Sequence, residues 1–186
     1  MRIIAGEAKG RRLKAPEGRD TRPSSDKLRG ALFNILYPRL AGSRVLDLFG
    51  GTGALALEAL SRGAERAVIV DQSREAVRCI RENALAVLGD GYAARAVILQ
   101  ADYRKALEHL EGPAFDLVFL DPPYAMREAY GEALRRLKAA GLLAEDALAV
   151  LEVESGADIA LPEGFIAVDQ RRYGAGTLIL AKEAQA

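Results

Sequence analysis

The stretch Asp47-Leu48-Phe49-Gly50-Gly51-Thr52-Gly53 decides the fold class, because it joins an apolar run to a helical pattern. Val45-Leu46, just before it, reads as a buried strand, and residues 53–62 read as a helix. Glycines between a strand and a helix let the backbone approach a ligand and direct helix amides at it. Residues 51–56, GTGALA, also satisfy the dinucleotide fingerprint, and Asp71 follows at the spacing that this fingerprint expects for its acid. A tight turn without a ligand would use the same glycines, so the loop by itself predicts only a βα unit.

The alternation of apolar runs and helical stretches continues along the chain. The apolar runs that predict parallel strands are 45–46, 67–70, 96–99, 117–120 and 148–151. The stretches that predict helices between them are 53–62, 73–88, 103–110 and 128–140. Two further runs, 165–168 and 177–180, have no helix between them and therefore predict an antiparallel pair. We predict an α/β fold with a mostly parallel seven-stranded sheet, one reversed strand near its edge, and helices on both faces.

Residues 1–40 differ from the rest of the chain in pattern and in charge. Residues 2–4 and 11–14 flank a glycine-bounded turn and predict a small hairpin, and a helix capped by Ser24 or Ser25 should end near Pro38. Residues 1–44 hold 11 Lys and Arg against 4 Asp and Glu, and the remainder of the chain carries the opposite excess. Because a local positive field attracts polyanions, we predict a basic nucleic-acid-binding extension at 1–40 and a main domain at 41–186. An ordinary arginine-rich surface would have the same composition.

The composition limits what kind of protein this is. The 186 residues suit one domain with a small extension, and 50% hydrophobic and 28% charged residues are ordinary for a globular protein. A single cysteine, Cys79, excludes an internal disulfide, and a single histidine, His109, excludes a histidine-rich metal site. No apolar run approaches the roughly 18 residues of a membrane span, and the start lacks the apolar core of a signal peptide. We expect a soluble cytoplasmic protein that binds no metal.

Acidic residues follow the first three predicted strands, at Asp47, Asp71 and Asp102. Because carboxyl ends of parallel strands meet at one edge of a sheet, the three should line one crevice. Asp47 would repel a pyrophosphate but suits a ligand with positive charge, and S-adenosylmethionine carries an ammonium and a sulfonium and no phosphate. Asp71 is placed to accept from ribose hydroxyls. Asp102 accepts from the adenine amine, caps the following helix, or does both.

The sequence Asp121-Pro122-Pro123-Tyr124 follows the fourth predicted strand at the same edge. Both prolines fix φ and lack an N–H, so the loop presents acceptors: the Asp121 carboxylate and the Pro122 carbonyl. An exocyclic amine of a nucleobase has two N–H donors for them, and Tyr124 offers a flat face on which the base can stack. An Asp-Pro-Pro sequence can simply end a strand, but beside a cofactor loop it indicates methyl transfer to a base amine.

These motifs resemble those of class I S-adenosylmethionine-dependent amino-methyltransferases, which have a Rossmann-like fold. Residues 22–34, RPSSDKLRGALFN, narrow the resemblance to the RsmD family, the bacterial 16S rRNA guanine-N2 methyltransferases. The similarity covers nearly the whole chain, and Gly30 is a departure from an expected acid. The Asp-Pro-Pro-Tyr motif is less specific, because DNA adenine methyltransferases share it.

The resemblance implies the roles of individual residues. The cofactor would contact Asp47, Phe49, Gly50, Gly51, Gly53, Asp71, Gln72, Asp102 and Tyr103. The catalytic residues that hold the target guanine would be Asp121, Pro122 and Tyr124. The basic residues expected to contact RNA phosphates are Arg11, Arg12, Lys14, Arg22, Lys27 and Arg29. The implied partner is 16S rRNA in an assembled small ribosomal subunit or a late precursor.

Other classes share parts of this pattern. A DNA adenine-N6 methyltransferase usually has an additional target-recognition segment, and only the short extension at 1–40 is spare here. A nicotinamide-dependent oxidoreductase would use the GTGALA loop, but Asp47 counts against it. A non-catalytic RNA-binding module would not need the acceptor motif. Arg171 and Arg172 would add phosphate contacts or only help close the sheet.

Overall fold

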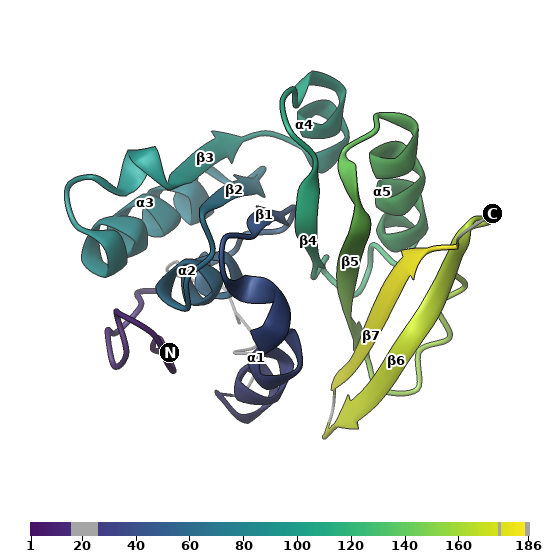
Figure 1. Ribbon diagram of the computed structural model, residues 1–186, viewed down its shortest axis with the longest axis horizontal. Coiled ribbons are helices and arrows are strands. Elements are labelled where there is room, and N and C mark those ends of the chain that lie inside the picture. The colour runs from purple at the N-terminus through teal and green to yellow at the C-terminus, as the bar shows by residue number, and fades with distance from the viewer. Residues whose placement is uncertain (16–25, 175, 185–186) are drawn as a thin grey trace.

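One seven-stranded sheet, in the order β3-β2-β1-β4-β5-β7-β6, runs through the molecule (Figure 1). This computed structural model describes residues 1–15, 26–174 and 176–184. The strands are β1 (Arg44–Asp47), β2 (Arg66–Asp71), β3 (Ala96–Gln100), β4 (Phe115–Leu120), β5 (Leu143–Glu154), β6 (Phe165–Tyr173) and β7 (Gly176–Glu183). The helices are α1 (Asp26–Leu40), α2 (Ala54–Ser61), α3 (Arg74–Leu88), α4 (Tyr103–His109) and α5 (Glu128–Ala139), with a 3-10 turn η1 at Tyr92–Ala94. Each predicted strand and helix is confirmed, and the strands extend beyond the apolar runs, β5 most of all.

The direction of the strands determines where a ligand crevice can form. Strands β1 to β5 run parallel, and β7 runs antiparallel to both β5 and β6, so the reversed strand is β7. The chain leaves β1 toward β2 on one side and later returns to β4 on the other. In open α/β sheets such a switch point creates a crevice at the carboxyl ends of the strands. The glycine loop after β1 and the loop at 121–124 both lie at this crevice.

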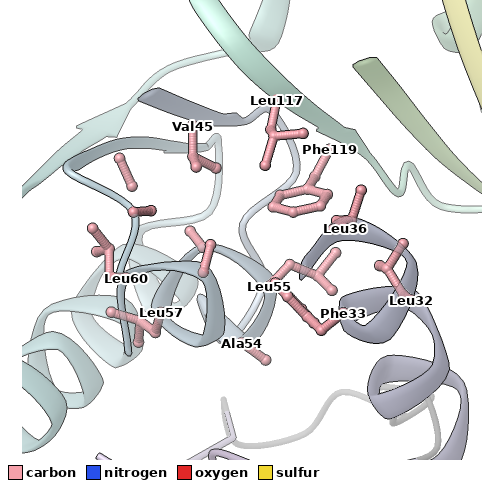
Figure 2. Close-up of a cluster of buried hydrophobic side chains, with 14 of the residues drawn as sticks. Leu32, Phe33, Leu36, Val45, Ala54, Leu55, Leu57, Leu60, Leu117 and Phe119 are labelled. Atoms are coloured by element: carbon pink, nitrogen blue, oxygen red, sulfur yellow. The ribbon is translucent and has the colours of Figure 1, made fainter. Parts of the chain in front are cut away.

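Two layers of helices bury the two faces of the sheet. Side chains of α1, α2 and α3 pack on one face, and those of α4 and α5 pack on the other. Figure 2 shows the first cluster, in which Leu32, Phe33 and Leu36 of α1 meet Leu55 of α2 and Phe119 of β4. The ring centroids of Phe33 and Phe119 lie 6.0 Å apart. Burying a large apolar side chain stabilises a fold by about 1.5–3 kcal/mol, so this cluster fixes α1 firmly to the sheet.

Residues 1–14 form a minimal hairpin that packs on α2 and α3. One antiparallel bridge pairs Arg2 with Arg12, and the Ile3 N–H donates to the Arg11 carbonyl at 2.9 Å. Ile3 and Leu13 are buried in the same cluster as the inner faces of α1 and α2. The predicted hairpin is confirmed in this short form, and the boundary near residue 40 does not separate two hydrophobic cores.

Polar side chains of α2 hold the hairpin in place. The buried Glu58 carboxylate accepts the N–H groups of Ile4 at 2.7 Å and Ala5 at 3.0 Å, and Arg62 donates to it at 2.6 Å. A Cβ at Gly6 would lie 1.9 Å from the Ser61 carbonyl oxygen, so only glycine allows this approach. The hairpin is therefore an integral part of the fold.

The helix α1 continues two residues beyond Pro38, which lies in its last turn. The proline has no N–H to donate to the preceding turn, and this loss is tolerated close to a helix end. The predicted cap at Ser24 or Ser25 lies outside the described residues. Within the described ranges, the helices are too short or too polar to cross a bilayer.

Candidate active site at the strand ends

The glycine loop after β1 is packed tightly against β2 and α3. The Gly50 N–H donates to the Val70 carbonyl at 2.8 Å, and a Cβ at Gly50 would lie 2.6 Å from a methyl carbon of Ile69. Gly53 has φ of 77°, a left-handed conformation that other residues rarely adopt. Among the described residues no side chain caps α2, and the Ala56 amide in its first turn faces the Asp47 carboxylate, so the amides of Ala54 and Leu55 are the ones that can meet an anionic ligand group.

Asp47 lies at the bottom of the crevice, with 1% of its surface exposed. The Phe49 N–H approaches its carboxylate at 3.4 Å, which is a long hydrogen bond. Burial raises the pKa of Asp47 to about 7, the amides of Phe49 and Ala56 oppose this shift, and the negative charge of Asp71 adds to it. A buried carboxyl with so little support for its charge is suited to a cationic partner.

Asp71 links the glycine loop to the start of α3. Its carboxylate oxygens accept the Gly51 N–H at 2.9 Å and the Ser73 N–H at 2.8 Å. Each carboxylate oxygen has a second lone pair, so the group can still accept from hydroxyls of a sugar. Gln72 is exposed beside it at the rim.

Asp102 differs from the other acids of the crevice because it caps a helix. Its carboxylate accepts the Arg104 N–H at 2.9 Å at the start of α4, so the predicted cap is present. The next residue, Tyr103, is buried, and its ring centroid lies 5.2 Å from that of Phe49. The Tyr103 hydroxyl donates to Glu132 at 2.8 Å, and burial together with this bond raises the pKa of Tyr103 to about 12. Phe49 and Tyr103 thus form an apolar wall between the ends of β1 and β3.

The Asp121 carboxyl lies where β4 ends, at the same edge of the sheet. Burial raises the pKa of Asp121 well above its usual range, and the charges of Glu152 and Asp47 raise it further. Pro122, next to it, is buried, whereas Pro123 is exposed and accepts the Met126 N–H at 2.7 Å through its carbonyl. Tyr124 is partly buried. The structure therefore brings together the acids of β1 and β4 that the sequence predicted.

Two residues that the sequence analysis did not assign lie beside Asp121. Glu152 on β5 is 9% exposed, and its main-chain carbonyl accepts from the Tyr130 hydroxyl at 2.5 Å. Burial raises the pKa of the Tyr130 hydroxyl, and the charges of Asp121 and Glu152 raise it further. A signal for Glu152 existed in the sequence, because it follows an apolar run as Asp121 does.

Among the predicted phosphate ligands, Arg29 is contradicted by the structure. Its side chain is 0% exposed and donates through Nη2 to the Arg2 carbonyl at 2.6 Å and to Asp26 at 2.9 Å. It therefore cannot reach an RNA backbone, because the helix that carries it turns it into the core. Lys14 is also engaged, with its Nζ 2.8 Å from Glu82. The exposed members of the set are Arg11, Arg12, Lys14 and Lys27, and Arg22 lies outside the described residues.

A basic groove that the sequence analysis missed runs along α3. Its volume is about 380 Å³, and Arg74, Arg78 and Arg81 line it together with Glu75, Val77 and Gln100. Their spacing places the three arginines on one side of the helix, which was a readable signal. The groove adjoins the strand ends through Gln100, which precedes Asp102 closely in the chain.

The chain is similar to known proteins over most of its length. The family model described as conserved hypothetical protein 95 matches residues 1–182. Ribosomal RNA small subunit methyltransferase D of Escherichia coli K12 is 36% identical over 154 residues, which are 83% of this chain and 75% of that protein. The protein of the same name from Haemophilus influenzae is 32% identical over 94% of this chain and 89% of its own.

A solved structure agrees with this relationship. The Escherichia coli protein yhhF superimposes with a TM-score of 0.83 at 33% identity and covers 100% of this chain and 99% of its own. The agreement includes the mostly parallel seven-stranded sheet with helices on both faces. The chain belongs to the conserved hypothetical protein 95 family, which is the RsmD family that its motifs resemble.

Proposed function

We propose that this protein transfers a methyl group from S-adenosylmethionine to the exocyclic N2 amine of a guanine in 16S rRNA of the small ribosomal subunit. The observation that carries the proposal is the acceptor loop at 121–124, which lies at the same sheet edge as the buried Asp47 and the glycine loop. The substrate is the assembled subunit or a late precursor, in the cytoplasm.

The residues of the crevice fit the cofactor. Asp47 is placed for the ammonium group of the methionine end, and the uncapped amides of α2 are placed for its carboxylate. Asp71 accepts from the ribose hydroxyls, and the Phe49–Tyr103 wall packs against the adenine beside Asp102. A pyrophosphate ligand would face buried acids instead, which disfavours a nicotinamide cofactor. S-adenosylmethionine, when bound, supplies an electrophilic methyl group on a sulfonium.

The acceptor loop prepares the guanine amine for reaction. The N2 lone pair is delocalised into the ring, so the nitrogen is a poor nucleophile. When the Asp121 carboxylate and the Pro122 carbonyl accept both N–H groups, they hold the nitrogen toward a tetrahedral shape and orient its lone pair. The raised pKa of Asp121 makes its carboxylate a stronger acceptor for the proton that leaves the nitrogen. Tyr124 stacks on the unstacked base.

The RNA backbone is bound by basic residues on the hairpin, on α1 and on α3. Arg11, Arg12 and Lys27 are exposed, and Arg74 and Arg81 line the α3 groove. Arginine presents a planar fork that matches phosphate geometry, so these side chains orient the RNA without reading its sequence.

Comparison of rRNA from two strains tests the proposed function. 16S rRNA from a strain lacking the gene should lose one N2-methylguanosine, detected by nucleoside mass spectrometry and mapped by primer extension. The wild-type gene should restore it, and a gene encoding Asp121→Ala should not. Unchanged 16S rRNA together with a loss of N6-methyladenine from DNA would overturn the proposal in favour of a DNA adenine methyltransferase.

A further inference from the structure

Helices α4 and α5 lie side by side and meet at a cluster of charged side chains (Figure 1). At its centre is Glu132 of α5. Its Oε1 accepts Arg104 Nε at 2.9 Å and Arg136 Nε at 3.0 Å, and its Oε2 accepts the Tyr103 hydroxyl at 2.8 Å. These hydrogen bonds, with that from Arg104 the strongest influence, lower the pKa of Glu132 to about 2 against the opposing effect of partial burial. Glu132 is therefore a carboxylate at neutral pH.

Arg104 lies between two carboxylates but is bonded through its side chain to one of them. Its Nε donates to Glu132 at 2.9 Å, whereas its Nη1 lies 3.7 Å from Oδ2 of Asp102, which is beyond hydrogen-bond distance. The guanidinium carbon also lies over the Tyr103 ring, 4.7 Å from its centroid. Glu132 and this ring thus hold the guanidinium in a position that stops short of Asp102.

The two carboxylate oxygens of Asp102 are consequently in different situations. Oδ1 accepts the Arg104 main-chain N–H at 2.9 Å as the cap of α4. Oδ2 accepts no hydrogen bond from the part of the chain that the structure describes. The Asp102 side chain is 31% exposed, so a ligand in the crevice can reach it. An unoccupied carboxylate oxygen is a suitable acceptor for an amine such as that of adenine.

A released Arg104 side chain would compete for this oxygen. A guanidinium is always charged, and its hydrogen bonds to a carboxylate are stronger than those of a neutral amine. Nη1 already lies close to Oδ2, so a small rotation of the Arg104 side chain would bring the two into contact. The hydrogen bond to Glu132 opposes this rotation, because it holds Nε of the same planar group.

We propose that Glu132 is a positioning residue, which holds Arg104 away from Asp102 and so keeps one oxygen of Asp102 available to the adenine amine of S-adenosylmethionine. This inference rests on the cofactor site of the proposed function. It gives a residue of α5 a part in the recognition of the cofactor.

Two ligands that differ in one amine test the inference. S-adenosylhomocysteine and its purine-riboside analogue, which has a hydrogen in place of the adenine amine, are titrated into the protein in a calorimeter. The wild-type protein should bind S-adenosylhomocysteine at least roughly tenfold more tightly, the scale of one hydrogen bond to a charged acceptor. Glu132→Gln keeps the length of the side chain without its charge, so Arg104 should move to Asp102. The preference should then fall to roughly threefold or less, mainly through weaker binding of S-adenosylhomocysteine.

A second substitution separates this role from a structural one. Arg104→Met removes the competing charge and keeps an unbranched side chain over Tyr103. Combined with Glu132→Gln, it should restore a preference of roughly tenfold, which a general loosening of the fold would not allow. Glu108→Gln is the matched control, because Glu108 pairs with Arg136 at 3.1 Å rather than with Arg104, and it should leave the preference unchanged.

Several results would overturn the inference. They are equal affinities of the wild-type protein for the two ligands, an unchanged preference in Glu132→Gln, an equal loss of affinity for both ligands, or no recovery in the double variant. If Glu132→Gln does not fold, NMR of the wild-type protein decides. The Arg104 Nε–H signal, assigned by its absence in Arg104→Met, should stay protected from solvent exchange when S-adenosylhomocysteine is bound, and its loss would overturn the inference. A wild-type protein that binds neither ligand would instead overturn the cofactor site of the proposed function.

Discussion

Asp47 lowers the stability of the protein in exchange for a site that attracts a cation. Its pKa rises from 3.8 to about 7 on folding, so the folded state binds more protons than the unfolded state between these values. The free energy of unfolding therefore falls as the pH rises through this window and is lowered by roughly 4 kcal/mol above it.

Asp47→Asn should therefore stabilise the protein, and more so at high pH. The stability difference between the variant and the wild type should grow by roughly 2–3 kcal/mol between pH 5 and pH 8, measured by urea unfolding. The same variant should bind S-adenosylhomocysteine more weakly in calorimetry, because the ammonium loses its counter-charge. Asp90→Asn, at an exposed position, is the control and should show neither effect. A pH-independent stability difference would contradict this account of Asp47.

Asp121 should contribute to the reaction and hardly to cofactor binding. Asp121→Ala removes an acceptor of the amine and of the leaving proton, so the rate of methyl transfer should fall roughly 10²–10⁴-fold. Asp121→Asn keeps one acceptor oxygen without the charge and should be intermediate. Methyl transfer to small subunits and binding of S-adenosylhomocysteine are measured on the same preparations. Normal transfer by the alanine variant would remove Asp121 from the reaction.

The sequence predicted the position of a residue correctly where a single local rule determines that position. Asp47, Asp71, Asp102 and Asp121 each follow a strand, and parallel strands bring such residues to one edge. The sequence analysis passed over Glu152, because its position beside Asp121 depends on the pairing of β5 with β4. Arg29 was predicted wrongly, because the charge of a segment does not reveal which of its side chains turn inward.

At the scale of elements, the contact between the hairpin and α2 depends on one buried carboxylate. Glu58→Ala would leave the N–H groups of Ile4 and Ala5 without their acceptor and Arg62 without its partner. Each unsatisfied buried group costs about 1–3 kcal/mol, so the variant should lose roughly 3–5 kcal/mol in urea unfolding. Glu65→Ala, at an exposed glutamate nearby, should change stability by less than about 0.5 kcal/mol. A small effect of Glu58→Ala would mean that the hairpin is held by its apolar residues alone.

The elements themselves were largely predictable, but their ends were not. The apolar runs and the 3.6-residue pattern indicated every strand and α-helix that the structure shows between β1 and β7, but not the short 3-10 turn η1. Strand β5 begins at Leu143, well before the apolar run, because Leu143 already pairs with Phe115 of β4, and the register then shifts across the polar residues in between. Helix α1 continues beyond Pro38 to Leu40, although a proline normally marks the end of a helix. Tertiary contacts thus override local preference at the boundaries.

At the scale of the molecule, the uneven distribution of charge predicts how RNA binding responds to salt. Arg11→Glu with Arg12→Glu should weaken binding to small subunits and reduce its salt slope by roughly 0.7–0.9 for each phosphate that is no longer neutralised. Affinity for S-adenosylhomocysteine should stay the same, because both side chains are exposed and the residues proposed to hold the cofactor belong to other segments. Arg135→Glu with Lys105→Glu, exposed on α5 and α4 on the opposite face, is the charge-matched control. Unchanged affinity in the double variant at every salt concentration would show that this charge is ordinary surface.

The same comparison can be extended to α3. Arg78→Glu with Arg81→Glu would test the groove that adjoins the strand ends. A reduced salt slope in both double variants would indicate that the RNA contacts the hairpin and continues across α3. A reduced slope in the hairpin variant alone would restrict the path to the hairpin.

The single cysteine offers a way to measure how often the end of the hairpin detaches from α3. The Cys79 thiol is buried beneath residue 14 and donates to the Lys14 carbonyl at 3.2 Å, and burial raises its pKa. Asn83, one turn further along α3, donates to the same carbonyl at 3.0 Å and to the Thr52 carbonyl of the glycine loop at 2.9 Å.

An alkylating reagent can therefore reach the sulfur only while this end of the hairpin is lifted. The ratio of its rate to that of an unprotected thiol gives the equilibrium constant for lifting, without any added label. Slower alkylation on addition of S-adenosylhomocysteine would then reveal that the glycine loop and the hairpin close together.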